Sequence, residues 1–551
     1  MNMSRIWGTL DPFYEPGPVV GRRMANAQFL RALLARDPFD EYHFFFVNSD
    51  SCDCCRDHFE KVYSGIWVRN RIKLFHRIEL PRRLRENSYY CFHQSDCILF
   101  PMHIARLRNL YSERIFPITG VTHSLSNTNV AESILRHIWP GASARDCIIA
   151  TSTTGCEVVR RFIRCLRSAY GLDTERFPEP AVERIPLGID TAEFTPLVKS
   201  IRSSVRQKLG IGPQHTMLLV FGRIEYDSKM DMVPLFRAVQ RLSRDGTDTR
   251  LMKLVIAGWI TDESRFPELL HRMARHAGID LVIVPRPTEK QKIELYGAGD
   301  IFLSPVDNPQ ETFGITVVEA GAMGLPVIAS DYDGYRDLIR HDVTGLRIPT
   351  MGASRTRMID ALAPVCFDNQ YHLLLAQQTV VDVGALAAAI KGLLEDRHRR
   401  RQMGRDARDY VLQNFSWDSV ISMYLALWDR LWKREVERKA LGEAAHPSHT
   451  PYADIFGCHT SSTVSDEMVV VWSTTGQSLY RGQDFTVVYG VIDELVSEDI
   501  VKKMLFLARY PVTYDMLVKK MVERIPGCDR ERSQYIILWS LKHDFLECAQ
   551  Q

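Results

Sequence analysis

The sequence predicts an α/β protein with two Rossmann-like, doubly wound domains that face a cleft, followed by a small α+β domain. Short apolar, strand-like runs alternate with helix-like segments in both halves of the region before residue 430. A stretch rich in Gly and Pro, PLGIDTAEFTP, interrupts this alternation directly after Ile185. After residue 435 a polar segment precedes a last unit with a different pattern. These observations predict three domains.

Each half has its own series of strand candidates. In the first half they are Tyr42–Asn48, Asp96–Phe100, Pro117–Val121 and Asp146–Thr151. In the second half they are Thr216–Phe221, Leu254–Ala257, Leu281–Val284, Ile301–Ser304 and Pro326–Ser330. Helical patterns lie between them, for example at Arg22–Ala35 and Thr154–Ala169. Because strands that alternate with helices form βαβ units, both halves are predicted to be parallel sheets whose ligands bind at the carboxyl ends of the strands.

The predicted domains have the following bounds. Residues 1–200 form the first Rossmann-like domain and residues 201–413 the second, while 414–435 is an amphipathic helix, 436–451 a linker and 452–551 the small domain. In the last of these, a strand at Met468–Trp472 precedes helices at Ile492–Arg509, Thr513–Glu523 and Asp529–Glu547.

Composition excludes several classes of protein. The 551 residues are 45% hydrophobic and carry a net charge of +2, so the whole-chain charge indicates no polyanionic partner. Met1–Pro12 lacks the basic start and apolar core of a signal peptide, and no apolar run approaches the roughly 18 residues that a membrane-spanning helix needs. We therefore expect a cytoplasmic protein.

Two local clusters have alternative interpretations. Cys52, Cys54 and Cys55 lie close together, but no second ligand pair follows them, so free thiols are favoured over a zinc site and no metal is expected. The stretch from Lys61 to Arg85 is rich in basic residues. It is either a patch for anionic lipid, and thus for peripheral membrane contact, or a solvated surface.

The most informative motif is ETFGITVVE, from Glu311 to Glu319. It follows a predicted buried strand and opens a helix, whose unpaired N–H groups and positive dipole end suit a phosphate. Gly314 permits close approach of a ligand to the backbone. At 1.5 Å of rise per residue the two glutamates lie roughly 12 Å apart, so they could accept hydroxyl hydrogen bonds at opposite ends of a diphosphate-linked ligand.

Basic residues follow the first strand of the second half. In FGRIEYDSK, Arg223 can bind a phosphate through two hydrogen bonds and Lys229 adds a point charge. In the first half, PGPVVGRRMAN offers Gly17 and Gly21 for close backbone approach, and His123 follows another strand. His123 and the two glycines could equally be structural residues.

The ordered set of motifs resembles the family-four retaining glycosyltransferases of GT-B fold over about residues 1–435. The set comprises the Gly loop, His123, PLGIDTAEFTP, GRIEYDSK, the E-x7-E stretch and GAMGLPVIASDYDGYRDLIRHDVTGLRIP, and it closes with NFSWDSVISMYLALW. The resemblance implies transfer of a hexose-type sugar from a nucleotide-diphosphate sugar, with UDP or GDP as the nucleotide, to an acceptor hydroxyl of unknown identity. It also implies front-face displacement, with no metal and no cofactor besides the donor.

The resemblance assigns a role to each motif residue. Glu311 would bind the donor sugar, with Phe313, Gly314 and Ile315 beside it, and Glu319 would bind the ribose. Arg223 and Lys229 would bind the diphosphate, and Gly21 would close over the phosphates. His123 would contact the transferred sugar and Arg286 would line the base pocket.

The sequence also departs from the family pattern. Asp331–Asp337 replaces the Gly-Gly pair and Glu that family members often carry, Gly258-Trp259 replaces a Gly-rich turn, and Met351–Gln378 resembles an insertion that could form a rim over the acceptor side. Two alternative functions stay open. One is a non-catalytic sugar-nucleotide-binding scaffold that recruits a partner, and the other is a GT-B relative such as an epimerase.

The last unit resembles winged-helix modules, including small peptide-binding ones of the PqqD type. From His446 onward, ten Lys and Arg face fourteen Asp and Glu, which gives a formal charge of −4 and disfavours nucleic-acid binding. Docking of a peptide or partner protein is the favoured hypothesis for this unit, and a packing or dimerisation domain is the alternative.

Overall fold

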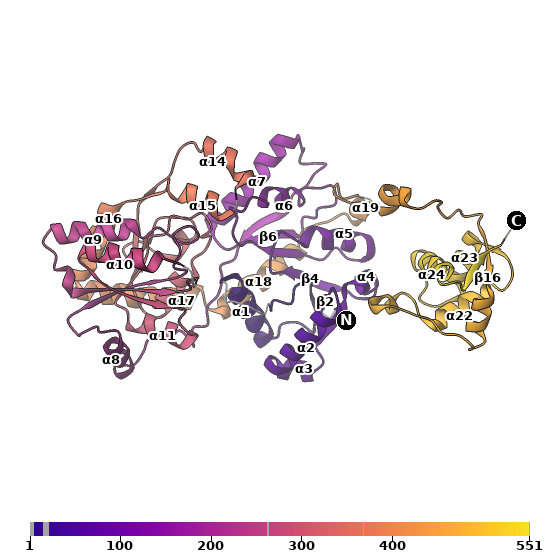
Figure 1. Cartoon of the computed structure of the whole chain (residues 1–551), viewed down its shortest axis with the longest axis horizontal. Coiled ribbons are helices and arrows are strands. Elements are labelled where there is room, and N and C mark those ends of the chain that lie inside the picture. Colours follow the sequence, from indigo (N-terminus) through magenta and orange to yellow (C-terminus); the bar gives the residue numbers. More distant parts are fainter. Residues whose placement is uncertain (1–4, 15–20, 262–263, 367, 443, 550–551) are drawn as a thin grey trace. The chain divides into compact units, whose positions relative to one another are not determined.

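The computed structural model describes residues 5–14, 21–261, 264–366, 368–442 and 444–549. The chain divides into two compact units. The larger one contains Met1–Phe44, His58–Lys73 and Leu84–Pro447, and the smaller one contains Ser448–Gln551 together with Phe45–Asp57 and Leu74–Arg83. Figure 1 colours the chain from indigo at its start to yellow at its end. Among the described residues, no helix has the length and apolar character needed to cross a membrane.

The first half of the chain forms a seven-stranded sheet within the described residues, in the order β3-β2-β1-β4-β5-β6-β7. Its strands are β1 Ile6–Thr9, β2 Glu41–Phe46, β3 Ile72–His76, β4 Tyr89–Gln94, β5 Ile118–Val121, β6 Asp146–Ala150 and β7 Ala181–Arg184. The strand pairs from β2 to β7 are parallel. The order reverses direction between β1 and β4, which is the switch point of a doubly wound sheet.

The second half repeats this order in a six-stranded sheet, β10-β9-β8-β11-β12-β13, as far as the described chain extends. Its strands are β8 Thr216–Phe221, β9 Met252–Gly258, β10 Asp280–Pro285, β11 Ile301–Ser304, β12 Val327–Ser330 and β13 Gly345–Ile348. All five strand pairs are parallel. Here the switch point lies between β8 and β11. The prediction of two Rossmann-like parallel sheets is therefore confirmed.

Helices connect and cover the strands (Figure 1). In the first half they are α1 Gly21–Arg36, α2 Ser49–Val62, α3 Ser64–Val68, α4 Leu80–Glu86, α5 Pro101–Tyr111, α6 Val130–Leu135 and α7 Thr153–Tyr170. In the second half they are α8 Lys199–Lys208, α9 Val233–Arg244, α10 Phe266–Ala277, α11 Glu289–Ala298, α12 Ile315–Ala322, α13 Tyr335–Leu338, α14 Arg357–Leu362, α15 Asp368–Ala376, α16 Val383–Glu395 and α17 Arg397–Asn414. A short antiparallel pair, β14 Thr350–Met351 and β15 Val380–Val381, flanks α14 and α15.

The helix that follows returns to the first sheet. This helix is α18, Trp417–Trp432, and it packs against α1. The indole of Trp428 donates a hydrogen bond to Thr119 in β5 at 3.2 Å, and that of Trp432 donates to the Tyr90 carbonyl in β4 at 2.8 Å. A further helix, α19 Arg438–Gly442, packs against α5.

The strands are apolar because helices cover both faces of a parallel sheet. All five residues of β6 and the central residues of β8 are buried, which explains why these segments appear in the sequence as continuous apolar runs rather than as alternating ones.

One predicted strand of the first half is wrong. Asp96–Phe100 is not a strand, and β4 lies just before it at Tyr89–Gln94. The Asp96 carboxylate accepts hydrogen bonds from the backbone N–H groups of Ile98 and Leu99 at 2.8 and 2.9 Å, so the chain turns here. Pro101 then starts α5 at a position where its missing N–H is not needed.

The smaller unit has a three-stranded antiparallel sheet within its described part, in the order β17-β16-β18. Its elements are α20 Tyr452–Phe456, β16 Val469–Trp472, α21 Thr474–Tyr480, α22 Glu498–Leu507, β17 Val512–Thr513, α23 Tyr514–Arg524, α24 Arg530–Lys542 and β18 Leu546–Cys548. The predicted helix Asp529–Glu547 is wrong at its end. Asp544 has a positive φ of 58°, which stops the helical path, and the chain returns as β18.

Candidate functional site

The residues predicted to bind the donor gather at the switch point of the second sheet. Arg223 and Lys229 lie in the loop after β8, and Glu311 lies in the loop after β11. Doubly wound sheets bind ligands beyond the carboxyl ends of their strands at this point. The Lys229 ammonium donates a hydrogen bond to Glu311 Oε2, and only 13% and 14% of the two side chains are exposed. The structure therefore joins the two motifs directly.

Two polar residues that the sequence analysis missed hold the loops together. Asn308 Nδ2 donates to the Asp227 carbonyl at 2.8 Å, and the Asp307 carboxylate accepts from the Asp231 N–H at 3.2 Å. Burial raises the pKa of Asp307 to about 7. Both residues follow a buried strand within four positions of Glu311, and this placement is the signal that could have identified them.

A close contact between two backbones shapes the loop that carries Arg223 and Lys229. Gly258 has φ of 148°, and a Cβ atom there would lie 1.7 Å from the carbonyl oxygen of Gly222. The Gly222 N–H donates to the Ala257 carbonyl at 3.0 Å. The close approach of β9 to the loop after β8 therefore requires glycine at position 258.

Arg223 is the more accessible of the two cations. Its guanidinium donates to the Ser228 carbonyl at 2.8 Å and lies 3.6 Å from the Glu225 carboxylate, with 42% of the side chain exposed. These contacts hold the guanidinium beside the loop, and its exposure leaves it accessible to an anion.

In the E-x7-E stretch, the residue before the helix has a left-handed backbone conformation. Gly314 has φ of 101° and directly precedes α12, which begins at Ile315. A Cβ atom on Gly314 would lie 2.1 Å from the ring of Tyr335, a fully buried residue whose hydroxyl hydrogen-bonds to Ser304 at 2.7 Å. Phe313, which directly precedes Gly314, is buried, and its ring centre lies 6.2 Å from that of Phe415. Packing therefore fixes where the free amides of the helix begin.

Glu319, predicted to bind the ribose, is buried in α12. Its Oε1 lies 2.6 Å from Lys292 Nζ, and its Oε2 accepts a hydrogen bond from the Tyr296 hydroxyl at 2.9 Å. Burial raises the pKa of Glu319, while the charge of Lys292 acts in the opposite direction.

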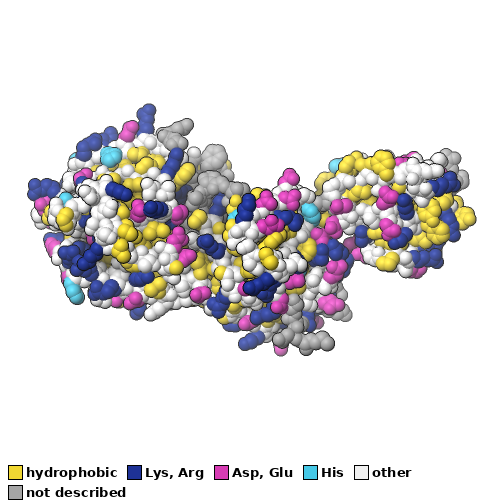
Figure 2. Space-filling model, turned by 90° about the horizontal axis from the view of Figure 1, so that it is seen from below, with side chains coloured by type: hydrophobic (Ala, Val, Ile, Leu, Met, Phe, Trp, Pro, Cys, Tyr) yellow, Lys and Arg dark blue, Asp and Glu magenta, His cyan; other side chains and the backbone are white. Residues whose placement is uncertain are grey.

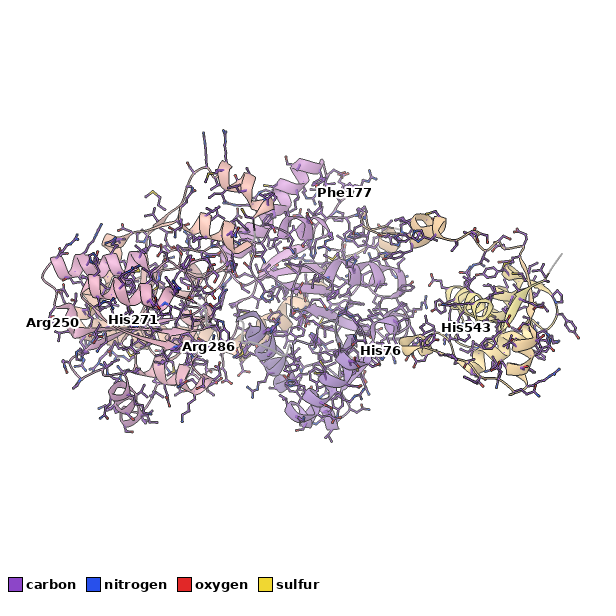
Figure 3. The ribbon with its side chains drawn as sticks, in the orientation of Figure 1. His76, Phe177, Arg250, His271, Arg286 and His543 are labelled. Atoms are coloured by element: carbon purple, nitrogen blue, oxygen red, sulfur yellow. The ribbon has the colours of Figure 1, made fainter. Side chains whose placement is uncertain are left out.

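Arg286 lies at the end of β10, at the position that Figure 3 labels. It has a positive φ of 46°. Its Nε donates to the Ile260 carbonyl at 2.9 Å, and its guanidinium lies 4.7 Å from the ring centre of Trp259. The side chain is thus fixed against the end of β9.

In the first sheet, the switch point lies between β1 and β4. The His123 Nε2–H donates to the Ser95 carbonyl at 2.6 Å, and the Ser95 hydroxyl donates to Asp11. Asp11 and Ser95 were not predicted, although both follow strands. Gly21 is the first residue of α1, whereas Gly17 lies outside the described residues.

The predicted insertion contacts the loop that carries Glu311. Gln310 donates to Asn369 at 3.0 Å and to His372 Nδ1 at 2.5 Å. Gln377 donates to Asp231 at 3.2 Å. The segment therefore supports the loops on which Glu311 and Lys229 lie.

Asp333 lies in the segment Asp331–Asp337 and has an unusual conformation. Its φ is 42°, and its Oδ1 is buried without a hydrogen-bond partner among the described residues. Burial, together with the negative charge of Glu311, raises the pKa of Asp333 to about 7. This carboxyl is thus poised to change protonation near neutral pH.

The two ambiguous clusters of the first half have defined surroundings. Cys52, Cys54 and Cys55 are free thiols, and within the described ranges no group of three or more His, Cys, Asp or Glu side chains is arranged to hold a metal ion. In the basic stretch, Arg71 pairs with Asp37 and the guanidinium of Arg83 lies 2.8 Å from Glu79.

The chain is similar in sequence to known glycosyltransferases. Residues 202–355 match the sequence model of the family described as Glycosyl transferases group 1. A D-inositol 3-phosphate glycosyltransferase of Xylanimonas cellulosilytica is 26% identical over 301 residues, which cover 54% of this chain and 60% of that protein. One from Corynebacterium aurimucosum is 31% identical over 234 residues, which cover 42% and 47%. The chain thus spans about half the length of these curated relatives.

A solved structure shows the same architecture. Anabaena Alr3699/HepE, in complex with UDP and glucose, is similar with a TM-score of 0.51 and 13% sequence identity, and the match covers 78% of this chain and all of that one. At this identity the likeness establishes the fold alone. The chain therefore has a two-sheet fold of the GT-B type, and its residues 202–355 are similar to the family described as Glycosyl transferases group 1.

Proposed function

We propose that this protein is a glycosyltransferase that moves a hexose-type sugar from a nucleotide-diphosphate sugar to an acceptor hydroxyl. The observation that carries the proposal is the buried contact between Lys229 and Glu311 at the switch point of the second sheet. The named activity of the curated relatives supports it, as does a similar fold that holds UDP and glucose. UDP is accordingly the first nucleotide to test.

The roles follow from charge and position. Lys229, Arg223 and the free amides at the start of α12 would bind the diphosphate. Glu311, which the Lys229 ammonium holds in place, would accept hydrogen bonds from hydroxyls of the donor sugar. Glu319 would bind the ribose at the other end of the donor.

The reaction would proceed with retention by front-face displacement. The bond between the anomeric carbon and the diphosphate oxygen breaks, the acceptor oxygen bonds to the same face, and the leaving phosphate takes the acceptor proton. Lys229 and Arg223 would stabilise the charge that develops on the diphosphate, so the proposal needs no metal or further cofactor. His123 and Asp11 would lie on the acceptor side.

Hydrolysis of nucleotide sugars tests the proposal. We expect the full chain to hydrolyse one member of a panel of UDP-, GDP-, ADP- and dTDP-sugars slowly without acceptor. Glu311→Gln and Lys229→Met should each lower that turnover on the order of 100-fold, because each removes a group that acts in the transition state. Glu268→Gln is the control, since Glu268 is exposed on α10.

Binding of a donor without any turnover would instead favour the scaffold function. Equal turnover in Glu311→Gln and wild type would show that the site lies elsewhere.

Docking of a peptide or partner protein on residues 452–551 stays a prediction. Apolar side chains are visible on the face of the smaller unit that Figure 2 shows. Tyr480 stacks on Phe506 at 6.2 Å, and 71% of Tyr510 is exposed. Exposed aromatic groups of this kind are typical of surfaces that bind other proteins.

A further inference from the structure

The ribose-binding carboxylate of the proposed site is held by two side chains to which no function is yet assigned. Glu319 lies on the buried side of α12, with 6% of its side chain exposed. Lys292 and Tyr296 approach it from one face of α11, four residues apart, as neighbours on a helix do.

Within the described part of the chain, each oxygen of the carboxylate receives one donor. Lys292 Nζ lies 2.6 Å from Oε1, and the Tyr296 hydroxyl donates to Oε2 at 2.9 Å. A carboxylate can accept about four hydrogen bonds, two at each oxygen. One acceptor position therefore stays available at each oxygen, which matches the two neighbouring hydroxyls of a ribose.

The surroundings fix the lysine as well. Only 14% of the Lys292 side chain is exposed, and its ammonium lies 5.2 Å from the ring centre of Phe194 and 6.0 Å from that of Phe221. Tyr296 is fully buried and stacks on Phe221 at 5.2 Å. Rings around a cation favour its charged form and leave it few alternative positions.

We propose that Lys292 and Tyr296 are positioning residues that hold Glu319 as a fixed carboxylate, so that it accepts hydrogen bonds from both ribose hydroxyls of the donor. The inference rests on the proposed function, since it presumes that a ribonucleotide binds beside α12.

Charge accounts for the need for a lysine. Burial raises the pKa of Glu319, and the Lys292 ammonium opposes that effect. The titratable groups that act on Glu319 are Glu289, Lys292 and Tyr296 on α11. Tyr335 on α13 acts on Tyr296, and the guanidinium of Arg408 on α17 bonds to the carbonyls of Phe194 and Ala322. Strands β11 and β12 contribute no charged residue. Lys292 is therefore the nearest cation, and without it the Glu319 carboxyl would hold its proton to higher pH.

Calorimetric titration of the full chain tests the inference. The probes are UDP, GDP and ADP and their 2′,3′-dideoxy counterparts. At pH 7, Lys292→Met should weaken binding of the best ribonucleotide about 10- to 100-fold, as loss of a charge-assisted hydrogen bond does. Binding of its dideoxy counterpart should change little. Affinity of this variant for the ribonucleotide should rise with pH, because burial raises the pKa of Glu319 and the carboxyl must lose its proton to accept both hydroxyl hydrogen bonds.

Three further variants complete the design. Lys292→Arg keeps the charge and should restore most of the affinity at pH 7. Tyr296→Phe removes one donor and should cost less than Lys292→Met, without the pH dependence. Lys290→Met is the matched control, because Lys290 is 86% exposed on the same helix and should not affect binding.

The outcomes are separable. Wild-type affinity in Lys292→Met, or an equal loss for ribo- and dideoxy nucleotides, would overturn the positioning role and leave the proposed function intact. If the wild-type chain binds none of the nucleoside diphosphates, the proposed function fails, and this inference fails with it. Melting curves will show whether Lys292→Met folds. If it does not, Lys292→Arg and Tyr296→Phe still test the inference. Wild-type affinity in Tyr296→Phe at all pH values would contradict the two-donor arrangement.

Discussion

Asp333 has three features that are unfavourable for the stability of the folded protein. It occupies the left-handed region of backbone conformation, at φ of 42°, its Oδ1 lacks a partner among the described residues, and its pKa is raised to about 7. Asparagine tolerates this backbone conformation and cannot ionise. The position therefore isolates the effect of the charge.

We predict that Asp333→Asn stabilises the protein at pH 8 by about 1–3 kcal/mol, because it removes a buried negative charge that lies near that of Glu311. The folded state binds the Asp333 proton more tightly than the unfolded state does, so wild-type stability falls as the pH rises from about 4 to 7. The gain from the substitution should therefore shrink at pH 5. Melting curves at both pH values measure it.

Asp342→Asn is the control for that experiment. Asp342 also has a positive φ, 64°, but it is exposed and pairs with Arg399 at 2.7 Å. Its substitution should change stability by less than about 0.5 kcal/mol at either pH. A gain in Asp333→Asn that is the same at pH 5 and pH 8 would contradict an effect of charge.

Single residues were predictable from sequence only where a strand or a helix start gives their position. Glu311 and Lys229 follow apolar strands, and their proximity follows from a parallel sheet. Lys292 was not predicted, because its contact with Glu319 depends on how α11 packs beside α12. Asp307 was missed although it follows an apolar strand close to Glu311, because its hydrogen bond with the Asp231 N–H depends on tertiary structure.

At the scale of elements, the start of α12 depends on one glycine. We predict that Gly314→Ala destabilises the second sheet by about 2–4 kcal/mol, from left-handed strain plus the overlap of the new Cβ with the buried Tyr335 ring. Denaturant unfolding measures the change. Donor binding should weaken as well, because the amides at the helix start would shift.

Gly324→Ala is the matched comparison at the other end of that helix. Gly324 has φ of 75°, and its nearest neighbour lies 3.8 Å from the position of an added Cβ. Only the strain of about 1–2 kcal/mol should appear. Equal losses in the two variants would show that contact with Tyr335 is unimportant.

The sequence predicted those strands best that have continuous apolar runs. It did not predict β4, since YYCFHQ places His93 and Gln94 inside the protein, where they bond to other buried groups. It also missed β18, because this short strand follows α24 closely and has a similar mixture of polar and apolar residues. In both cases tertiary contacts, and not local preference, decide the structure.

At the scale of the whole molecule, the two compact units should respond separately to damage. We predict that Gly476→Val unfolds the part of the smaller unit formed by Ser448–Gln551, since a Cβ at this position would lie 2.1 Å from the Phe545 carbonyl oxygen. Calorimetry should show one transition shifted to lower temperature. Donor hydrolysis by the larger unit should remain within about twofold of wild type, and a parallel loss would contradict independent units.

The return of α18 to the first sheet affects the order of events during synthesis. Thr119 and Tyr90 receive their indole partners from Trp428 and Trp432, which leave the ribosome after the entire second sheet. At the usual elongation rates of about 5–20 residues per second, the aromatic surface of the nascent first domain stays exposed for on the order of ten to fifty seconds before α18 is synthesised. During that interval we expect chaperones that bind exposed apolar segments to bind the growing chain.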